Sequence, residues 1–259
     1  MMAWISIAVL AGANMYNQAF DQANAAYDAG DYQTAIDAYE QLISESVVHP
    51  VVFFNLGNAY YRSGCLGAAV ANYERALQLN PRAEDARENL DKCVRETKQQ
   101  LARPRPPDWE QSLLFWHYNL PPRVTRLTAI ILWFLFWSLL AVRLVRPIRF
   151  FRHAALGVGL LALAFGLSAW TKAHTDLYAV AVDEQVPVHY GTSEDETVRF
   201  YLYAGDRVLV DRREKGWARV MTSDDERGWV KQDALALVGP PYERPRPPRP
   251  ATGNSGGVS

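Results

Sequence analysis

The stretch Phe53-Phe54-Asn55-Leu56-Gly57-Asn58-Ala59-Tyr60-Tyr61, which continues to Pro81, decides the fold of this chain. Small and apolar residues recur there at helical spacing in two successive segments, first Phe53, Leu56, Gly57 and Tyr60, then Ala69, Tyr73 and Ala76. The small residues allow two helices to approach closely, the aromatic rings fill the remaining space, and Pro81 ends the second helix. The stretch therefore predicts a helix-turn-helix unit that buries one face of each helix.

This unit is repeated along the chain. Gly30 and Gly64 lie in corresponding turns separated by 64 − 30 = 34 residues, which is the period of a tetratricopeptide repeat (TPR). In the second helix of the earlier unit, Ala35, Tyr39 and Leu42 align with Ala69, Tyr73 and Ala76 of the later one. The first helix of the earlier unit is degenerate, with Ala19, Ala23 and Ala26 in place of Phe53, Gly57 and Tyr60. Residues 14–101 resemble a short TPR array that ends in an amphipathic capping helix from Ala83 to about Leu101.

The TPR resemblance implies a curved surface that holds another protein. Asn24 and Asn58 occupy the same repeat position and resemble the amides that grip an extended peptide in this family, because an amide can donate and accept at once. The alternative is that these residues follow the repeat consensus without contacting a ligand. The predicted protein-binding groove consists of Phe20, Asn24, Tyr27, Phe54, Asn58, Tyr61 and Arg62.

Two uncharged apolar runs, Leu127–Val142 and Ala154–Trp170, occupy the middle of the chain. Each is slightly shorter than the roughly 20 residues that cross a bilayer, but flanking residues extend both. They predict a two-span transmembrane hairpin over residues 124–171, and a buried hairpin of a soluble protein is the alternative. Small residues in the second run predict close helix packing, either between the two spans or in a dimer: Ala155, Gly159, Ala162, Gly166 and Ala169.

The Arg-rich loop over residues 143–152 sets the orientation. Short loops rich in arginine remain in the cytoplasm, so both flanking regions are expected outside it. Arg123, Arg126 and Lys172 at the other end of the hairpin oppose this orientation, but they are less densely spaced. The apolar segment 1–13 resembles a signal sequence without a basic start, and it is expected to be cleaved before Asn14, kept as an anchor, or part of the first repeat helix.

Alternating β-branched and aromatic residues over 176–238 predict an all-β domain of short strands. The pairs Gly216-Trp217 and Gly228-Trp229 resemble bacterial SH3-like barrels, a family in which the domain binds cell-wall peptides or supports a neighbour. The predicted SH3-like groove is Tyr190, Tyr203, Trp217 and Trp229, and the alternative places these rings in the barrel core. The flanking segments are Pro-rich: a linker with an interfacial helix at 102–123, and a plain disordered tail at 239–259.

Several function classes are disfavoured. The formal net charge is −1 at pH 7, and acidic runs in the β region argue against nucleic acid as a partner. No histidine pairs with a second ligand at metal-binding spacing, and neither a phosphate-binding loop nor a nucleophile elbow is present. The sequence therefore predicts no enzyme, no cofactor and no metal site. Cys65 and Cys93 could form a disulfide or remain two unpaired thiols.

The order of these segments resembles the BatE-type proteins of bacterial aerotolerance operons over nearly the whole chain. That resemblance implies an inner-membrane scaffold with periplasmic TPR and SH3-like domains. The implied partners are membrane-bound von Willebrand factor A proteins and a MoxR-type AAA+ ATPase system. A peptidoglycan-binding sensor or anchor that acts through the SH3-like domain is the alternative function.

Overall fold

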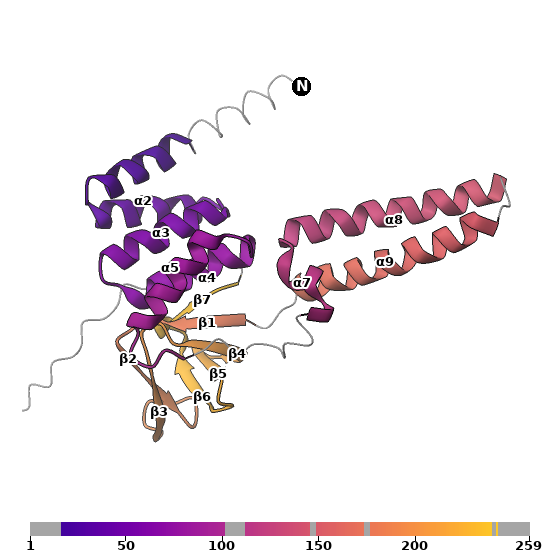
Figure 1. The fold of residues 1–259 in the computed structure, drawn as a ribbon. Helices are drawn as coiled ribbons and strands as arrows, with labels where there is room; N and C mark the ends of the chain where they lie inside the picture. Colours follow the sequence, from indigo (N-terminus) through magenta and orange to yellow (C-terminus); the bar gives the residue numbers. More distant parts are fainter. Residues whose placement is uncertain (1–16, 102–111, 146–148, 174–176, 240–241, 243–259) are drawn as a thin grey trace, which may run out of the picture. The chain divides into compact units, whose positions relative to one another are not determined.

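The computed structural model describes residues 17–101, 112–145, 149–173, 177–239 and 242. The signal-like segment 1–13 and nearly all of the tail 239–259 lie outside these residues. The chain forms two compact units, one that joins the helical repeats to a β-sheet and one that contains the two long apolar helices. The predicted fold class of helical repeats, an apolar helix pair and an all-β region is confirmed (Figure 1).

The first unit begins with antiparallel pairs of helices. Residues 17–28 are helical, and they precede α2 (Tyr32–Ser44), α3 (Pro50–Arg62), α4 (Leu66–Leu79) and α5 (Glu84–Glu96). Gly30 and Gly64 have φ angles of 81° and 83°, a left-handed conformation that glycine adopts without steric cost. The predicted turns therefore occur at these two glycines.

Close packing between α3 and α4 depends on Gly57. A Cβ at this position would lie 2.8 Å from the ring of Tyr73, so any other residue would force the two helices apart. The predicted inner-face residues of α3 and α4 are all buried: Phe53, Leu56, Gly57, Tyr60, Ala69, Tyr73 and Ala76. The helix α5 ends at Glu96, earlier than the predicted end near Leu101, because the residues that follow it contact the sheet.

The sheet of the first unit has seven antiparallel strands in the order β3-β2-β6-β5-β4-β1-β7. The strands are β1 (Leu177–Ala181), β2 (Gln185–His189), β3 (Val198–Tyr203), β4 (Arg207–Glu214), β5 (Trp217–Met221), β6 (Arg227–Lys231) and β7 (Leu235–Leu237). Alternate residues such as Val188, Ala218 and Val230 face a buried core, as the alternation of the sequence predicts. The strand β7 was not predicted.

The helix α4 lies between the other repeat helices and the sheet. Every residue from Gly67 to Ala76 is buried, whereas a surface helix ordinarily exposes a polar side. A Cβ on Gly67 would lie 2.5 Å from the carbonyl oxygen of Ala181, so glycine is required for this approach. The sheet contributes four side chains to the hydrophobic core of the repeats: Val180, Val182, Ala236 and Val238. The repeats and the sheet therefore share a core.

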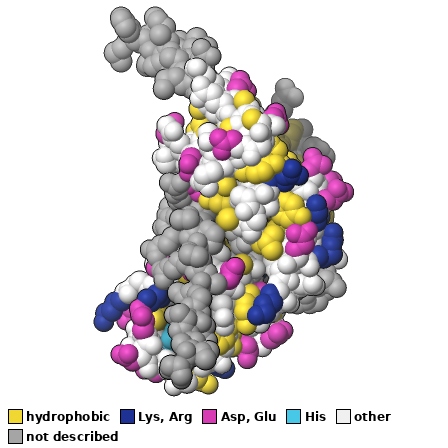
Figure 2. Space-filling view, turned by 90° about the vertical axis from the view of Figure 1, so that its left-hand side faces the viewer, with side chains coloured by type: hydrophobic (Ala, Val, Ile, Leu, Met, Phe, Trp, Pro, Cys, Tyr) yellow, Lys and Arg dark blue, Asp and Glu magenta, His cyan; other side chains and the backbone are white. Residues whose placement is uncertain are grey.

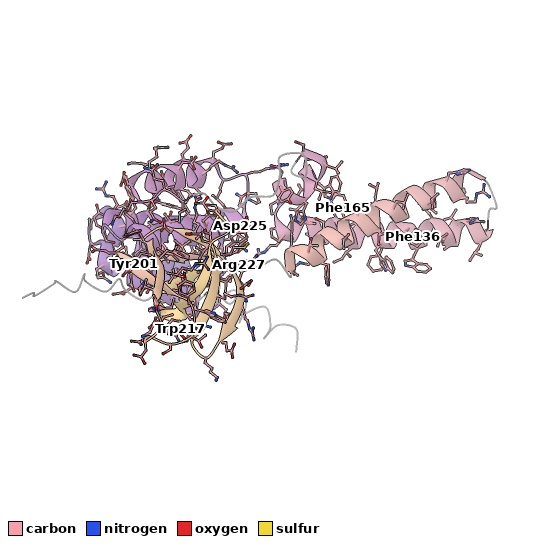
Figure 3. All side chains as sticks on the ribbon, turned by 90° about the horizontal axis from the view of Figure 1, so that it is seen from below. Phe136, Phe165, Tyr201, Trp217, Asp225 and Arg227 are labelled. Atoms are coloured by element: carbon pink, nitrogen blue, oxygen red, sulfur yellow. The ribbon has the colours of Figure 1, made fainter. Side chains whose placement is uncertain are left out.

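The second unit contains α7 (Phe115–Asn119), α8 (Pro122–Val145) and α9 (Arg149–Ala173). By length and composition, α8 and α9 are apolar enough to cross a membrane, with mean hydropathies of 2.1 and 1.7 over their most apolar windows. Ala155 and Ala162 are buried, and a Cβ on Gly159 would lie 3.0 Å from the ring of Phe136 (Figure 3). These small residues therefore pack α9 against α8. Packing between the two spans was one of the two predictions for the small residues of the second apolar run.

Candidate peptide-binding groove

Asn24, in the helix over residues 17–28, is bound to side chains of two other helices. Its Oδ1 accepts a hydrogen bond from the hydroxyl of Tyr39 at 2.6 Å and another from Nδ2 of Asn55 at 3.0 Å. Burial raises the pKa of Tyr39 to about 12, so this hydroxyl stays protonated and remains a donor at neutral pH. The side-chain oxygen of Asn24 therefore holds successive helices together.

Asn58 has the same arrangement one repeat later. Its Oδ1 accepts from the hydroxyl of Tyr73 at 2.9 Å and from Nδ2 of Asn89 at 3.0 Å. Within the part of the chain that the structure describes, the Nδ2 groups of Asn24 and Asn58 donate to no acceptor. Each amide therefore offers a ligand a donor only, rather than the donor and acceptor that a free amide provides.

Phe20 and Phe54 place an aromatic ring beside each of these amides. The ring centroid of Phe20 lies 6.1 Å from that of Tyr39, and the centroid of Phe54 lies 6.2 Å from that of Tyr73. Both phenylalanines are half-buried. A repeated pair of amide and aromatic side chains thus combines a hydrogen-bond donor with an apolar contact surface.

Tyr27 and Arg62 meet at Tyr32, which the sequence did not single out. The Nε of Arg62 donates to the hydroxyl of Tyr32 at 3.0 Å, and its guanidinium carbon lies 5.4 Å from the centre of that ring. The ring of Tyr27 approaches Tyr32 edge-on, with 5.5 Å between centroids. Arg62 is exposed, so its charge remains accessible beside a cluster of aromatic rings.

Tyr61 connects α3 to α5. Its hydroxyl donates to Oε1 of Glu96 at 2.6 Å, and Nζ of Lys92 lies 4.9 Å from the ring centroid. Acidic, basic and hydrophobic side chains are also interspersed on the side of the molecule shown in Figure 2. The charges near the predicted groove are therefore mixed, which favours a peptide over a polyanion.

The hydrogen bonds of the two asparagines have the same sequence separations, 15 residues to the tyrosine and 31 residues to the next asparagine. Two copies of one structural unit produce such a pattern. Residues 20–84 match the tetratricopeptide repeat family model. Repeats of this family are non-catalytic modules for protein–protein interaction. A comparison with curated proteins finds no match to the chain.

The four predicted residues of the β-sheet do not all lie together. Trp217 is buried with its ring edge-on to His189, 5.5 Å between centroids, and Trp229 is the register partner of His189. Tyr190 follows His189 in the chain and is 62% exposed. Tyr203 pairs with Gln185 at the opposite end of β2. Three of the four rings therefore gather near one end of β2, and Tyr203 is separate.

Two charged residues of α4 bind the sheet, and sequence reasoning missed both. Arg75 is 1% exposed and donates from Nε and Nη2 to the carbonyl of Leu237 at 2.9 and 2.7 Å. Glu74 forms a buried ion pair with Arg207 at 3.1 Å. The sequence nevertheless indicated that α4 is covered on both sides, because Gly67, Ala68, Val70 and Ala71 leave its outer side without polar residues.

Both cysteines are free thiols. Cys93 is buried, and its Sγ donates weakly to the carbonyl oxygen of Leu66 at 3.7 Å. Burial raises the pKa of Cys93 to about 12, so this thiol is unreactive at neutral pH. In the described ranges, no cluster of three His, Cys, Asp or Glu side chains could hold a metal ion.

Proposed function

We propose that this protein is a non-enzymatic, membrane-anchored adaptor that binds protein partners in the bacterial cell envelope through its TPR groove. The observation that carries the proposal is the repeated pair Asn24 and Asn58. Their oxygens are held by tyrosine and asparagine donors, while their Nδ2 groups donate to no acceptor in the described residues. A backbone carbonyl of an extended peptide is the matching acceptor, and Phe20 and Phe54 supply apolar contacts beside it.

The membrane location rests on α8 and α9 together with the arginines of residues 143–152. Helices of this length and hydropathy can cross a bilayer, and an Arg-rich loop between them favours a cytoplasmic position for that loop. We expect α8 and α9 to lie in the inner membrane, with the TPR region and the β-sheet in the periplasm. The resemblance to BatE-type proteins further suggests von Willebrand factor A membrane proteins and a MoxR-type ATPase system as partners.

Site-specific photo-crosslinking in native membranes tests the groove. Val51 is 43% exposed on α3, one helical turn before Phe54 and Asn55, so a photoreactive residue there should yield a partner adduct. The same residue at Gln41, exposed on the outer helix α2, should yield none. Adducts from position 41 and none from position 51 would show that the partner does not bind in the groove.

A charge substitution gives a second test without disturbing the asparagine network. Val51→Glu is an exposed change and should alter the melting temperature little, yet it should abolish partner recovery in co-purification. Gln41→Glu is the matched control and should leave recovery unchanged. Equal recovery with both variants would contradict a groove-bound partner.

Cysteine accessibility in intact cells tests the orientation. Only Cys65 needs replacement, because Cys93 is buried with its pKa raised to about 12. A cysteine introduced at the exposed Asp195 should react with a membrane-impermeant maleimide, and one at Pro147 in the loop should not. The reverse pattern would place both domains in the cytoplasm.

Peptidoglycan binding through an SH3-like surface is the second candidate, favoured by the exposed ring of Tyr190, which follows His189 at the end of β2. The sheet shares its core with α4, so an excised fragment would expose Val180 and Ala236, and the test requires the full chain. Sedimentation of detergent-solubilised protein with isolated peptidoglycan should then fall in Tyr190→Ala and persist in Val51→Glu. Absence of sedimentation for the unmodified chain would exclude this function.

A further inference from the structure

The sheet has an edge strand at each end, and the helix α4 covers one of them. The strand β7 forms that edge, and all three of its residues are buried. The carbonyl of Leu237 in β7 accepts two hydrogen bonds from the guanidinium of Arg75 in α4. Such cover matters because an open edge strand offers its backbone groups to another chain. The opposite edge of the sheet is β3 (Figure 1).

The backbone groups of Tyr201 in β3 point away from the neighbouring strand β2. In the pairing of these strands, Tyr201 lies opposite Pro187, which has no N–H, and Tyr203 lies opposite Gln185. The N–H of Tyr203 donates to Oδ2 of Asp206 at 2.7 Å rather than to β2. Because bonded and non-bonded pairs alternate along an antiparallel ladder, the N–H and C=O of Tyr201 point outwards as well. Among the residues that the structure describes, these two groups have no hydrogen-bond partner.

A pocket of about 330 Å³ opens along this edge. Every residue from Phe200 to Tyr203 lines it, although successive residues of a strand face opposite sides of the sheet. The other lining residues come from the chain after α5 and from the β5–β6 loop: Gln99, Leu101, Thr222, Asp224 and Glu226. A pocket lined by both faces of one strand follows the edge of that strand, so an extended chain can enter it beside β3.

The charged residues that line the pocket are both acidic. Asp224 and Glu226 are exposed, and the ion pairs of the described residues include neither of them. Leu101 and Phe200 supply apolar surface, since both pack against the core of the sheet while staying partly exposed. An added strand turns alternate side chains to opposite sides, and carboxylates bind cationic side chains through charge-assisted hydrogen bonds. A strand with alternating basic and apolar residues therefore matches this pocket.

The cations near the edge already have contacts within the chain. Nζ of Lys98 lies 3.8 Å from the centre of the Tyr203 ring, so the accessible part of the edge is centred on Tyr201, which is 42% exposed. Arg199 donates from Nη1 to the carbonyl oxygen of Arg227 at 2.8 Å. Figure 3 labels Tyr201 and Arg227 on the sheet. The basic groups that pair with Asp224 and Glu226 must therefore come from outside this chain.

We propose that β3 binds an extended segment of another protein, with alternating basic and apolar residues, by β-strand addition. The backbone of that segment exchanges hydrogen bonds with Tyr201, and its basic side chains pair with Asp224 and Glu226. A second copy of this chain fits less well, because two copies would bring their acidic β5–β6 loops to the same edge, where like charges repel. This surface is separate from the TPR groove and does not depend on it.

Fluorescence anisotropy with defined peptides and the detergent-solubilised full chain tests strand addition. A labelled peptide of alternating lysine and valine should bind, and the same peptide with glutamate in place of lysine should bind at least about tenfold more weakly. Two further versions, methylated at the backbone nitrogen of every lysine or of every valine, keep the charge. Only alternate amides of an added strand face β3, so one version should lose about tenfold in affinity and the other little. Equal affinities of the two methylated peptides would overturn strand addition.

Charge substitutions locate the binding site. Asp224→Lys with Glu226→Lys should weaken binding of the lysine–valine peptide roughly tenfold. Asp85→Lys with Glu88→Lys makes the same change of charge at exposed positions of α5 and should leave the affinity unaltered. Equal effects of the two double variants would indicate attraction by overall charge and contradict the site. Val51→Glu should not weaken binding either, and a loss there would place the peptide in the TPR groove instead of on β3.

Hydrogen exchange reads the pairing directly at the backbone. The amide of Tyr201 should exchange more slowly once the lysine–valine peptide is bound, while exchange in β7 should not change. Unchanged exchange at Tyr201 in the presence of bound peptide would contradict pairing with β3.

The variant Tyr201→Pro separates a foreign strand from a second copy of this chain. Proline is tolerated on an edge strand where its missing N–H would face outwards, and this change should weaken peptide binding about tenfold. Light scattering should give the same mass for Tyr201→Pro and the unmodified chain. A dimer of the unmodified chain that is lost in Tyr201→Pro would identify the second copy as the occupant and overturn the proposal.

Discussion

At the scale of single residues, Asp206 is a carboxylate with incomplete hydrogen bonding. It is fully buried, and its Oδ2 accepts from the backbone N–H of Tyr203 at 2.7 Å. Among the residues that the structure describes, its Oδ1 has no hydrogen-bond partner. Burial raises the pKa of Asp206 to about 6, although the positive charge of Arg207 opposes this shift. Arg207 is itself paired with Glu74, which reduces its ability to offset the charge of Asp206.

This raised pKa makes the stability of the first unit depend on pH. The folded pKa of about 6 exceeds the ordinary value of 3.8, so the folded state binds the proton more tightly than the unfolded state. The stabilisation from protonated Asp206 is present below pH 3.8 and is lost as pH rises through 6. Asp206→Asn should therefore raise the melting temperature relative to the unmodified chain at pH 7, and this advantage should shrink as pH falls towards 4.

Thermal unfolding followed by circular dichroism at several pH values measures that difference. Asp195→Asn, in an exposed loop, is the control and should give a small difference that does not vary with pH. Parallel curves for Asp206→Asn and the unmodified chain would show that Asp206 does not titrate between these pH values.

At the scale of helices, the approach of α3 to α4 depends on one missing side chain. Gly57→Ala would place a Cβ 2.8 Å from the Tyr73 ring, and such overpacking costs about 1–3 kcal/mol. The melting temperature of the TPR helices should fall accordingly. Gly157→Ala in α9 is the matched control, because nothing lies within 4 Å of its Cβ position. An equal melting temperature for Gly57→Ala and the unmodified chain would show that the Tyr73 ring moves aside freely.

The sequence predicted elements whose burial comes from their own periodic pattern. The apolar face of α3 and the alternation in β4 are of this kind, and their positions are close to those predicted. The short strand β7 was missed because it has three residues and is buried by α4 from a distant part of the chain. The helix α5 was predicted too long because contacts with the sheet also determine the backbone after Glu96. Lys98 lies over the ring of Tyr203, and the carbonyl of Leu101 accepts a hydrogen bond from Arg207.

The candidate groove was predictable as a set of matching repeat positions, but its chemistry was not. Repeat alignment paired Asn24 with Asn58 and Phe20 with Phe54. It could not show that Tyr39 and Tyr73 occupy the asparagine oxygens, because those tyrosines lie on different helices.

At the scale of the whole molecule, the TPR region and the sheet form one unit held by buried charges on α4. Glu74→Gln removes the negative charge that pairs with the buried guanidinium of Arg207, and breaking a buried ion pair costs about 3 kcal/mol or more. Hydrogen exchange should therefore accelerate in β4 and β7 as well as in α4. Faster exchange confined to α4 would show that the two regions unfold independently.

An exposed ion pair within the sheet provides the comparison. Arg219 and Asp211 are 2.8 Å apart, with side chains 36% and 35% exposed, so Asp211→Asn should cost at most about 1 kcal/mol. Its effect on exchange should stay local to β4 and β5. A change in α4 as large as that caused by Glu74→Gln would contradict the special role of the buried pair.

The complete burial of α4 also limits how this protein can be enlarged. Repeat proteins usually gain or lose units at either end, because each unit contacts only its neighbours. Here a unit inserted after Pro81 would displace α5 and the Lys98–Leu101 segment on which the sheet depends. An engineered variant with a longer groove should therefore gain its additional repeats ahead of α3, where an inserted unit leaves α4, α5 and the sheet in place.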